Sequence, residues 1–207
     1  MVERQLRRRG IADQRVLAAM GAIPREAFVP ERMRRSSYDD SALPIGHQQT
    51  ISQPWVVAAI CQALALEGDE TVLEIGTGSG YSAAVLARLA RRVISLERLP
   101  ELVEGARAAL AEVGVPNVEV IEADGSRGYP AEAPYEAIAV HAATPEAPHS
   151  LLAQLAGGGR LVVPISAGAA DLLTAFRRTD DGLRQETIGP CRFVPLIGAE
   201  GFGPREE

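Results

Sequence analysis

Three glycines at alternate positions are the residues of this chain best suited to binding a ligand. They are Gly76, Gly78 and Gly80. The run before them, Thr71–Ile75, is largely apolar and rich in β-branched residues, which is typical of a buried parallel strand. A helical pattern follows, from Ser79 or Tyr81 onward. Strand, glycine turn and helix predict the first βα unit of a nucleotide-binding sheet, where a missing Cβ lets a ligand lie against the backbone.

The spacing of the glycines, and an acid before them, indicate the kind of ligand. A dinucleotide fingerprint reads G-x-G-x-x-G and holds a pyrophosphate. Here the third glycine comes one residue early, and Tyr81 stands where that pattern has glycine. Glu74, just before the turn, would repel a phosphate but would suit a ligand carrying an ammonium and a sulfonium. This resembles the first motif of class I methyltransferases that use S-adenosylmethionine; a structural turn without a ligand is the alternative.

Two further acids stand at the ends of predicted strands. Glu97 ends the run Arg92–Glu97, roughly 20 residues past the glycine turn, which is the offset at which a carboxylate binds ribose hydroxyls. Asp124 and Gly125 follow the run Val118–Ala123, and such a pair suits recognition of an adenine amino group by side chain and backbone. The alternatives are a solvated glutamate and an ordinary Asp-Gly turn.

Composition limits the functional classes. The length of 207 residues suits one α/β domain, and the net charge of −6 argues against a general nucleic-acid surface. All 21 basic residues counted in that charge are arginine, which excludes a P-loop lysine, a Schiff-base lysine and a pyridoxal phosphate anchor. The cysteines and histidines lack metal-ligand spacing, so we expect no metal, and we expect His47, His141 and His149 to be packing or loop residues. Without a signal peptide or an apolar run near the ~18 to 20 residues of a membrane span, the chain is expected to be soluble and cytoplasmic.

The first 35 residues form a separate, basic piece. Nine arginines against four acids give it a charge of +5. Apolar residues at helical spacing predict helices, one of them with Asp13 as its N-cap and Gly21 as its end. The run Arg7–Arg9 is either a solvated helix face or a patch that contacts a polypeptide or RNA.

Residues 36–53 show little periodicity and predict a long loop that leads into a helix at Pro54. A loop of this length inside a compact domain is either disordered or functional, and its apolar residues favour function. Ser52 therefore has two compatible interpretations. It is the N-cap of the following helix, or its hydroxyl lies beside free backbone N–H groups where a carboxylate can bind.

The rest of the chain alternates between strands and helices. Further strands are expected at Tyr135–Ala143 and Arg160–Ile165, with two edge strands at Leu172–Arg177 and Arg192–Leu196, and helices at Glu101–Val113 and Glu146–Leu155. This order predicts a doubly wound, mostly parallel α/β sheet of the Rossmann-like class, with ligands at the carboxyl ends of the strands and helices at the N-terminus. We expect a single domain over residues 1–207, with a helical segment and loop (1–53) and a cofactor-binding core (54–207).

Several motifs together resemble one family over nearly the whole chain. They are ALPIGHQQTISQP (42–54), VLEIGTGSGY (72–81), ADGSRGYPAEAPYEAI (123–138), GGRLVVPI (158–165) and RFVPL (192–196). In this order they are similar to protein-L-isoaspartate O-methyltransferases, and the TIS element is the most specific because generic methyltransferases lack it. The chain departs from many bacterial members at Gln48, where they have glycine, and from some at Val57, where they have histidine.

The resemblance implies roles for individual residues. Ser52, the TIS serine, would be the catalytic residue, and Thr50, Ser52 and Val194 would contact the substrate. The cofactor-binding residues would be Gln49, Thr50, Ile51, Glu74, Gly76, Thr77, Gly78, Ser79, Gly80, Tyr81, Glu97, Arg98, Asp124 and Gly125. The cofactor implied is S-adenosylmethionine, with S-adenosylhomocysteine as product.

The reaction implied is methylation of the α-carboxylate of L-isoaspartyl residues in damaged proteins, which starts repair through a succinimide. A related enzyme that methylates an aspartate of a dedicated precursor peptide is the nearer alternative, and a cofactor-binding protein without catalysis is the second. The expected partner is a peptide or protein containing isoaspartate or aspartate. No nucleic acid or membrane partner is expected, and the chain is expected to be a monomer.

Overall fold

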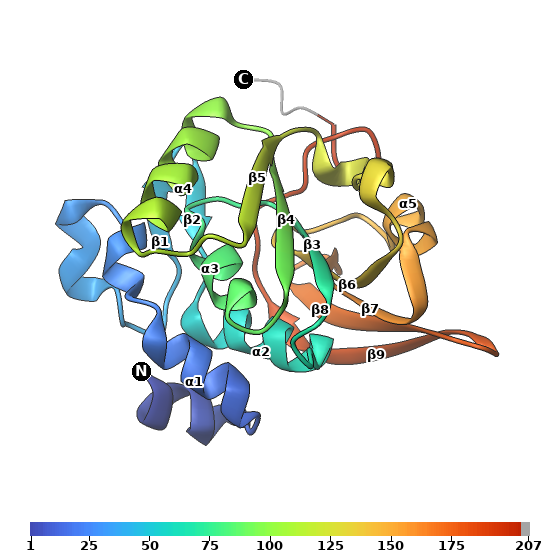
Figure 1. Ribbon diagram of the computed structural model, residues 1–207, viewed down its shortest axis with the longest axis horizontal. Helices are drawn as coiled ribbons and strands as arrows, with labels where there is room; N and C mark the ends of the chain where they lie inside the picture. The colour runs from blue at the N-terminus through green and yellow to red at the C-terminus, as the bar shows by residue number, and fades with distance from the viewer. Residues whose placement is uncertain (204–207) are drawn as a thin grey trace.

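A seven-stranded sheet forms the centre of the computed structural model, which describes residues 1–203 (Figure 1). The strand order is β5-β4-β3-β6-β7-β8-β9. The first five of these strands are parallel, while β8 and β9 add an antiparallel meander at one edge. The strands are β3 (Thr71–Ile75), β4 (Arg92–Glu97), β5 (Val118–Glu122), β6 (Tyr135–Val140), β7 (Leu155–Ser166), β8 (Asp171–Thr179) and β9 (Gly182–Cys191). The predicted mostly parallel, Rossmann-like class is confirmed.

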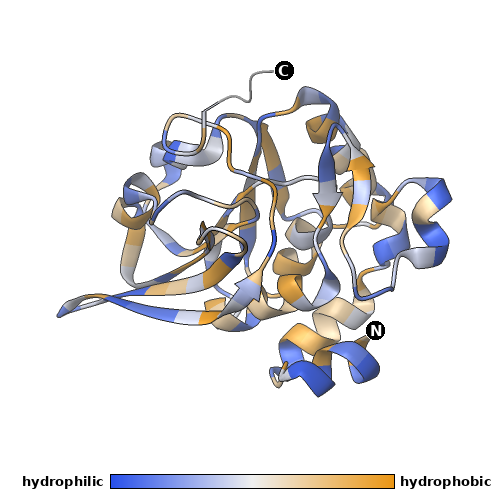
Figure 2. Ribbon diagram, turned by 180° about the vertical axis from the view of Figure 1, so that it is seen from behind, coloured by the Kyte–Doolittle hydropathy of each residue, from blue (hydrophilic) through white to orange (hydrophobic). Residues whose placement is uncertain are grey.

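Helices cover both faces of the sheet, but unequally. Alternate strand residues feed two hydrophobic clusters, with Val72 and Val93 in one and Leu73 and Ile94 in the other, because successive strand side chains point to opposite faces. The first cluster packs against four helices, and the second includes the short helix α5. The helices are α1 (Gln14–Ala22), α2 (Pro54–Leu64), α3 (Tyr81–Ala87), α4 (Pro100–Glu112) and α5 (His149–Ala153). Figure 2 shows hydrophobic colour concentrated in the centre and hydrophilic colour on the N-terminal turns and along the β8–β9 hairpin.

The N-terminal residues share the first cluster. Leu6, Leu17 and Met20 are buried together with residues of α2 and α3. Asp13 caps α1 as predicted, since its carboxylate accepts hydrogen bonds from the N–H groups of Arg15 and Val16. The helix continues one residue beyond Gly21, the predicted end. One hydrophobic cluster includes residues from both sides of residue 53. The proposed division of the domain at that residue stays a prediction.

Residues 36–53 are more ordered than the sequence indicated. They contain a hairpin of β1 (Leu43–Gly46) and β2 (Gln49–Ile51). His47 and Gln48 form its turn with φ of 49° and 57°, which is the left-handed pair that a tight type I′ hairpin turn requires. The turn lacks the usual glycine or asparagine, and for that reason the sequence pattern missed it.

The Gln48→Gly variant is expected to be more stable than the wild type by about 1 kcal/mol, because the left-handed conformation strains a residue with a Cβ and does not strain glycine. The Gln48 side chain is exposed, so the substitution removes little packing. Urea unfolding of both proteins measures the difference. Equal or lower stability of the variant would show that the backbone strain at this turn is negligible.

Two predicted elements differ from the structure. Arg192–Leu196 is not a strand: β9 ends at Cys191, and the segment crosses to the carboxyl end of β6, where Leu196 N–H donates to the Ala143 carbonyl at 2.7 Å. Pro195 lacks an N–H for a regular ladder. The predicted helix Glu146–Leu155 is only α5, because Pro148 disfavours helical backbone before it.

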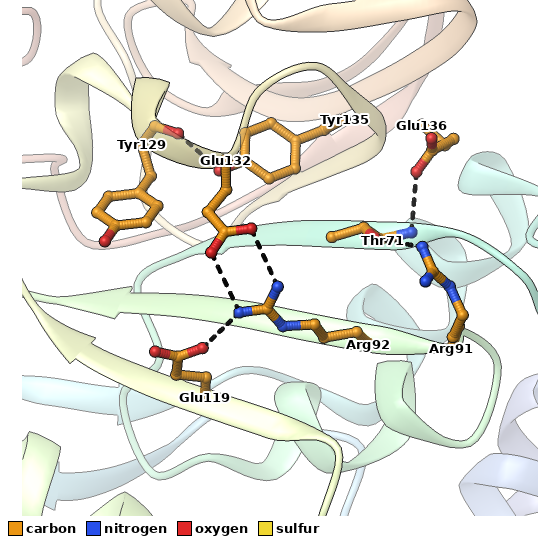
Figure 3. Close-up of polar contacts among 8 residues, drawn as sticks. All are labelled: Thr71, Arg91, Arg92, Glu119, Tyr129, Glu132, Tyr135 and Glu136. Atoms are coloured by element: carbon orange, nitrogen blue, oxygen red, sulfur yellow. Dashed lines mark hydrogen bonds and ion pairs between the residues drawn. The ribbon is translucent and has the colours of Figure 1, made fainter.

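A polar network lies at the amino ends of the central strands, away from their carboxyl ends (Figure 3). At the start of β4, the Arg92 guanidinium pairs with Glu119 at 2.6 Å and Glu132 at 3.0 Å. The Thr71 N–H donates to the Glu136 carboxylate at 2.9 Å. These groups are exposed, so each pair contributes at most about 1 kcal/mol and the network fastens strand ends without forming a site.

Candidate active site

A cavity that is partly open to solvent lies at the carboxyl ends of β3, β4 and β6. This position is where doubly wound sheets bind ligands. Four segments wall it. They are the end of the hairpin with Ser52 (49–52), the glycine turn (75–79), the end of β4 (96–99) and the crossing segment (194–197).

The glycine turn presents bare backbone to this cavity. Gly76 and Gly78 line it with φ of 87° and 55°, conformations that a side chain would strain. Gly80 also has positive φ but does not line the cavity. A Cβ there would lie 3.3 Å from the Ala106 Cβ, so Gly80 instead lets α3 pack closely against α4. Of the three predicted cofactor glycines, the cavity therefore includes two.

Glu97 is the most strongly oriented side chain in the cavity. Its carboxylate accepts three backbone hydrogen bonds, from Gly78 at 3.0 Å, Arg98 at 2.9 Å and Leu99 at 3.0 Å. These contacts tie the glycine turn to the end of β4. Two carboxylate oxygens offer about four acceptor positions, so Glu97 can still accept from a ligand hydroxyl.

The two residues of the Asp124–Gly125 pair have different surroundings. Gly125 lines the cavity, whereas Asp124 does not. The Asp124 carboxylate accepts from the Ser126 N–H at 2.9 Å and the Ala199 N–H at 3.0 Å. Burial raises the pKa of Asp124, but these hydrogen bonds outweigh it and hold the pKa below its ordinary value. The carboxylate thus holds the 124–126 turn and the segment after β9 together, and the contact of Asp124 with adenine stays a prediction.

Ser52 lines the cavity, as expected for a reactive position, but it is not a helix cap. Gln53 occupies the N-cap position of α2, without a side-chain hydrogen bond. Within residues 1–203 the Ser52 hydroxyl has no hydrogen-bond partner, so it is free to contact a ligand. Gln49, Thr50 and Ile51 also line the cavity.

A buried arginine fixes the backbone at Ser52. The Arg25 guanidinium donates to the Ser52 carbonyl at 2.8 Å and to the Ser37 carbonyl at 2.7 Å. It also lies over the Tyr81 ring, 4.8 Å from the ring centroid. Arg25 therefore connects the N-terminal segment, the Ser52 backbone and α3. This role of Arg25 cannot be recognised from the sequence, because a charged residue in a basic stretch is ordinarily exposed.

Glu74 lies behind the cavity wall and not in it. Its carboxylate is fully buried and accepts hydrogen bonds from the Ser82 and Ser95 hydroxyls. Burial raises the pKa of Glu74 to about 7, although the two serine hydrogen bonds act in the opposite direction. Ser82 and His141, which the sequence analysis did not select as ligands, line the cavity in front of it.

The Glu74→Gln variant is expected to be more stable than the wild type at pH 8. Folding raises the pKa of this carboxyl from 4.5 to about 7, so its ionisation destabilises the fold progressively as pH rises through that window. Above pH 7 the substitution is expected to raise the free energy of unfolding by about 3 kcal/mol. Below pH 4.5 this gain vanishes, because the Glu74 carboxyl is then neutral in both the folded and the unfolded protein. Urea unfolding at pH 5 and pH 8 measures the change. An equal difference between the two proteins at both pH values would contradict this ionisation.

The remaining predicted residues are mostly in the cavity. Those that line it are Thr77, Ser79, Tyr81, Arg98 and Val194. Val57, one of the departures, also lines it, so an apolar side chain stands where some family members are expected to have histidine. The lining residues that sequence reasoning missed include the apolar Leu96, Leu99 and Ile197, which no local motif marks.

Comparison with known proteins agrees with the geometry. The family model "Protein-L-isoaspartate(D-aspartate) O-methyltransferase (PCMT)" matches residues 1–201. Protein-L-isoaspartate O-methyltransferase 1 of Rhodopseudomonas palustris (strain HaA2) is 56% identical over 204 residues, 98% of this chain and 83% of that protein. The enzyme of strain CGA009 is 52% identical over 98% of this chain and 94% of its own. A solved protein-L-isoaspartate O-methyltransferase superposes with a TM-score of 0.84 at 30% identity, covering 97% of this chain and 67% of that one. The chain therefore belongs to the protein-L-isoaspartate(D-aspartate) O-methyltransferase family of S-adenosylmethionine-dependent methyltransferases.

Proposed function

We propose that this chain transfers a methyl group from S-adenosylmethionine to the α-carboxylate of L-isoaspartyl residues, with Ser52 as the residue that positions the carboxylate. The observation that carries this assignment of the site is that one cavity is lined by Ser52 and Val194, the expected substrate residues, and by Gly76, Gly78 and Glu97, the expected cofactor residues. Substrate and cofactor would thus meet across a few ångströms.

The lining residues fit the cofactor. Glu97 retains acceptor capacity for one ribose hydroxyl, and the bare backbone at Gly76 and Gly78 leaves room for the linkage between ribose and amino acid. Gly125 also lines the cavity, and only glycine fits there because a Cβ would lie 2.7 Å from an Ile75 methyl carbon, so we place the adenine ring beside this bare backbone. When bound, the cofactor supplies a methyl group on a positively charged sulfur.

The chain needs no general base for this reaction. The α-carboxylate at an isoaspartyl linkage has a pKa near ~3.5, so it is already the nucleophile at neutral pH. Transfer joins an anion with a cation to give a neutral ester and a neutral thioether, and a site that excludes water favours this loss of charge. Ser52 donates a hydrogen bond that holds one carboxylate oxygen while the other attacks. Most of the rate enhancement then comes from orientation, which can contribute about 7 to 11 kcal/mol.

The methyl ester prepares the residue for repair. The methoxy group of the ester leaves as methanol far more readily than a carboxylate loses oxide. The neighbouring backbone nitrogen therefore attacks the ester carbonyl, loses its proton to the departing methanol and closes a succinimide, whose hydrolysis partly yields normal aspartate. These later steps need no further residue of the chain.

The experiment is methyl transfer from labelled S-adenosylmethionine to two versions of one short peptide, one with isoaspartate and one with aspartate. Base-labile label on the isoaspartyl peptide alone supports repair. Label on the aspartyl version alone would assign the chain to peptide modification instead, and no label on either would remove catalysis from the proposal.

The chain is further expected to act as a monomer in the cytoplasm. Cys61 and Cys191 are both free, which suits a reducing compartment. None of the helices within residues 1–203 has the length and apolar character that crossing a membrane requires. Light scattering after size exclusion should give the mass of one 22.0 kDa chain.

A further inference from the structure

His141 is a buried polar side chain that faces the cavity without a partner. It follows β6 directly, and its side chain is only 6% exposed. In the part of the chain that the structure describes, neither ring nitrogen makes a hydrogen bond. The nearest acceptor, Glu74 Oε1, lies 3.4 Å from Nε2, which is too long for a good hydrogen bond. Buried polar groups are almost always paired, so a ring with two unpaired nitrogens beside a cavity is suited to bind a polar group of a ligand.

The imidazole is neutral and its two nitrogens differ. Burial lowers the pKa of His141 to about 4, so at neutral pH the ring has one donor and one acceptor. In its ionised form, which predominates above pH 7, the Glu74 carboxylate faces Nε2 and favours the proton on that nitrogen. Nδ1 is then left with a free lone pair. The atom is covered in this structure, so it accepts a hydrogen bond from a donor in the cavity after a small turn of the ring.

The charges around His141 favour a cationic donor. Glu74 lies behind the ring, and the charge of a second carboxylate, Glu97, raises the pKa of Glu74 further. The groups that hydrogen-bond to Glu74 are neutral, namely the hydroxyls of Ser82 and Ser95. The described residues thus place no cation against this buried carboxylate. A positive group at the ring would bind to the acceptor nitrogen Nδ1 and would also be attracted by the ionised Glu74 carboxylate on the other side of the ring.

The position along the cavity identifies which cationic group this is. A Cβ on Gly76 would lie 3.6 to 3.7 Å from His141 atoms, so His141 abuts the glycine turn. In the cofactor assignment proposed above, Gly125 lies beside the adenine ring and Glu97 binds the ribose. The amino-acid end of the cofactor then lies in the region of Gly76 and His141. We infer that His141 Nδ1 accepts a hydrogen bond from the α-ammonium group of S-adenosylmethionine, with the Glu74 carboxylate behind the ring opposing the ammonium charge. The inference rests on the cofactor assignment made above and adds a positioning residue to it.

Calorimetry with two ligands tests this role. S-adenosylhomocysteine carries the amino-acid end, whereas methylthioadenosine keeps the adenosine and the sulfur but lacks that end. The His141→Leu variant should bind S-adenosylhomocysteine at least 10-fold more weakly and methylthioadenosine within twofold of the wild type. The His141→Asn variant, which keeps an acceptor of similar reach, should recover most of the loss and keeps the test valid if leucine disturbs folding.

The outcomes separate the possible roles. Equal losses for both ligands would reduce His141 to a shape-filling residue and overturn the inference, as would unchanged affinity for S-adenosylhomocysteine. A rise in peptide KM with intact cofactor affinity would move His141 to the substrate side and overturn it as well. If the wild type itself failed to bind S-adenosylhomocysteine, the cofactor assignment would be wrong, whatever His141 does.

Nitrogen NMR of histidine-labelled protein gives an independent readout. Before ligand is added, the wild type should show a neutral His141 ring with the proton on Nε2. S-adenosylhomocysteine should shift the Nδ1 resonance, and methylthioadenosine should leave it unchanged. A proton on Nδ1 in the free protein would contradict the inferred acceptor.

Discussion

Methyl transfer to an isoaspartyl peptide is expected to fall by about 10- to 100-fold in the Ser52→Ala variant, because a hydrogen bond to a charged group contributes about 1.5 to 3 kcal/mol. The free hydroxyl lines the cavity, and Arg25 fixes the Ser52 backbone, so the substitution removes the donor without moving the chain. Cofactor affinity should stay within about threefold of the wild type, since the loss belongs to the substrate carboxylate. Steady-state kinetics and calorimetry measure the two quantities.

Matched variants show whether the hydroxyl itself is responsible. Ser52→Thr retains a hydroxyl and should retain more activity than Ser52→Ala. Ser41→Ala removes an exposed serine ahead of the hairpin and should leave turnover unchanged. Near wild-type turnover of Ser52→Ala would remove Ser52 from the mechanism.

Removal of the Glu97 carboxylate should weaken cofactor binding by about 10- to 100-fold or more. One charge-assisted hydrogen bond to a ribose hydroxyl is lost, which contributes about 1.5 to 3 kcal/mol. Glu97→Ala also leaves the N–H groups of Gly78, Arg98 and Leu99 without their acceptor, so the glycine turn loses its anchor to β4. Calorimetry with S-adenosylhomocysteine measures the effect.

The neighbouring strand supplies the control. Glu122 ends β5 as Glu97 ends β4 and is its register partner, but it is exposed and does not line the cavity. Glu122→Ala should bind the cofactor like the wild type. Unchanged affinity in Glu97→Ala would overturn the ribose assignment.

Local patterns predicted the parts of the fold that local forces decide. β3 and β4 have the bounds expected from the sequence, because a buried parallel strand is a continuous apolar run that glycine or charge interrupts. The crossing segment after β9 also has a strand-like composition, and only its tertiary partner at Ala143 distinguishes it from a strand. The hairpin turn at His47 and Gln48 was missed because both residues adopt a backbone conformation that their types disfavour.

The site was predictable where a motif lies on the backbone that forms it. The glycine turn, Glu97 and the segment ending at Ser52 line one cavity. The glycine turn and Glu97 were expected there from their spacing, and Ser52 from the family resemblance. Sequence cannot show which side chains turn inward after folding. Arg25 and His141 are buried, and Glu74 is covered by Ser82 and His141, so their roles became visible only from three-dimensional packing.

Arg25 has a consequence for the exchange of product for fresh cofactor. One guanidinium holds carbonyls on both sides of the hairpin, at Ser37 and Ser52, and rests on the ring of Tyr81. A lid hinged at Ser52 alone would have to break a charge-assisted bond inside a dry core. The carbonyls of Ser37 and Ser52 are thus fixed points on either side of the hairpin, and labels attached to β1 and β2 would report whether the hairpin between them moves during turnover.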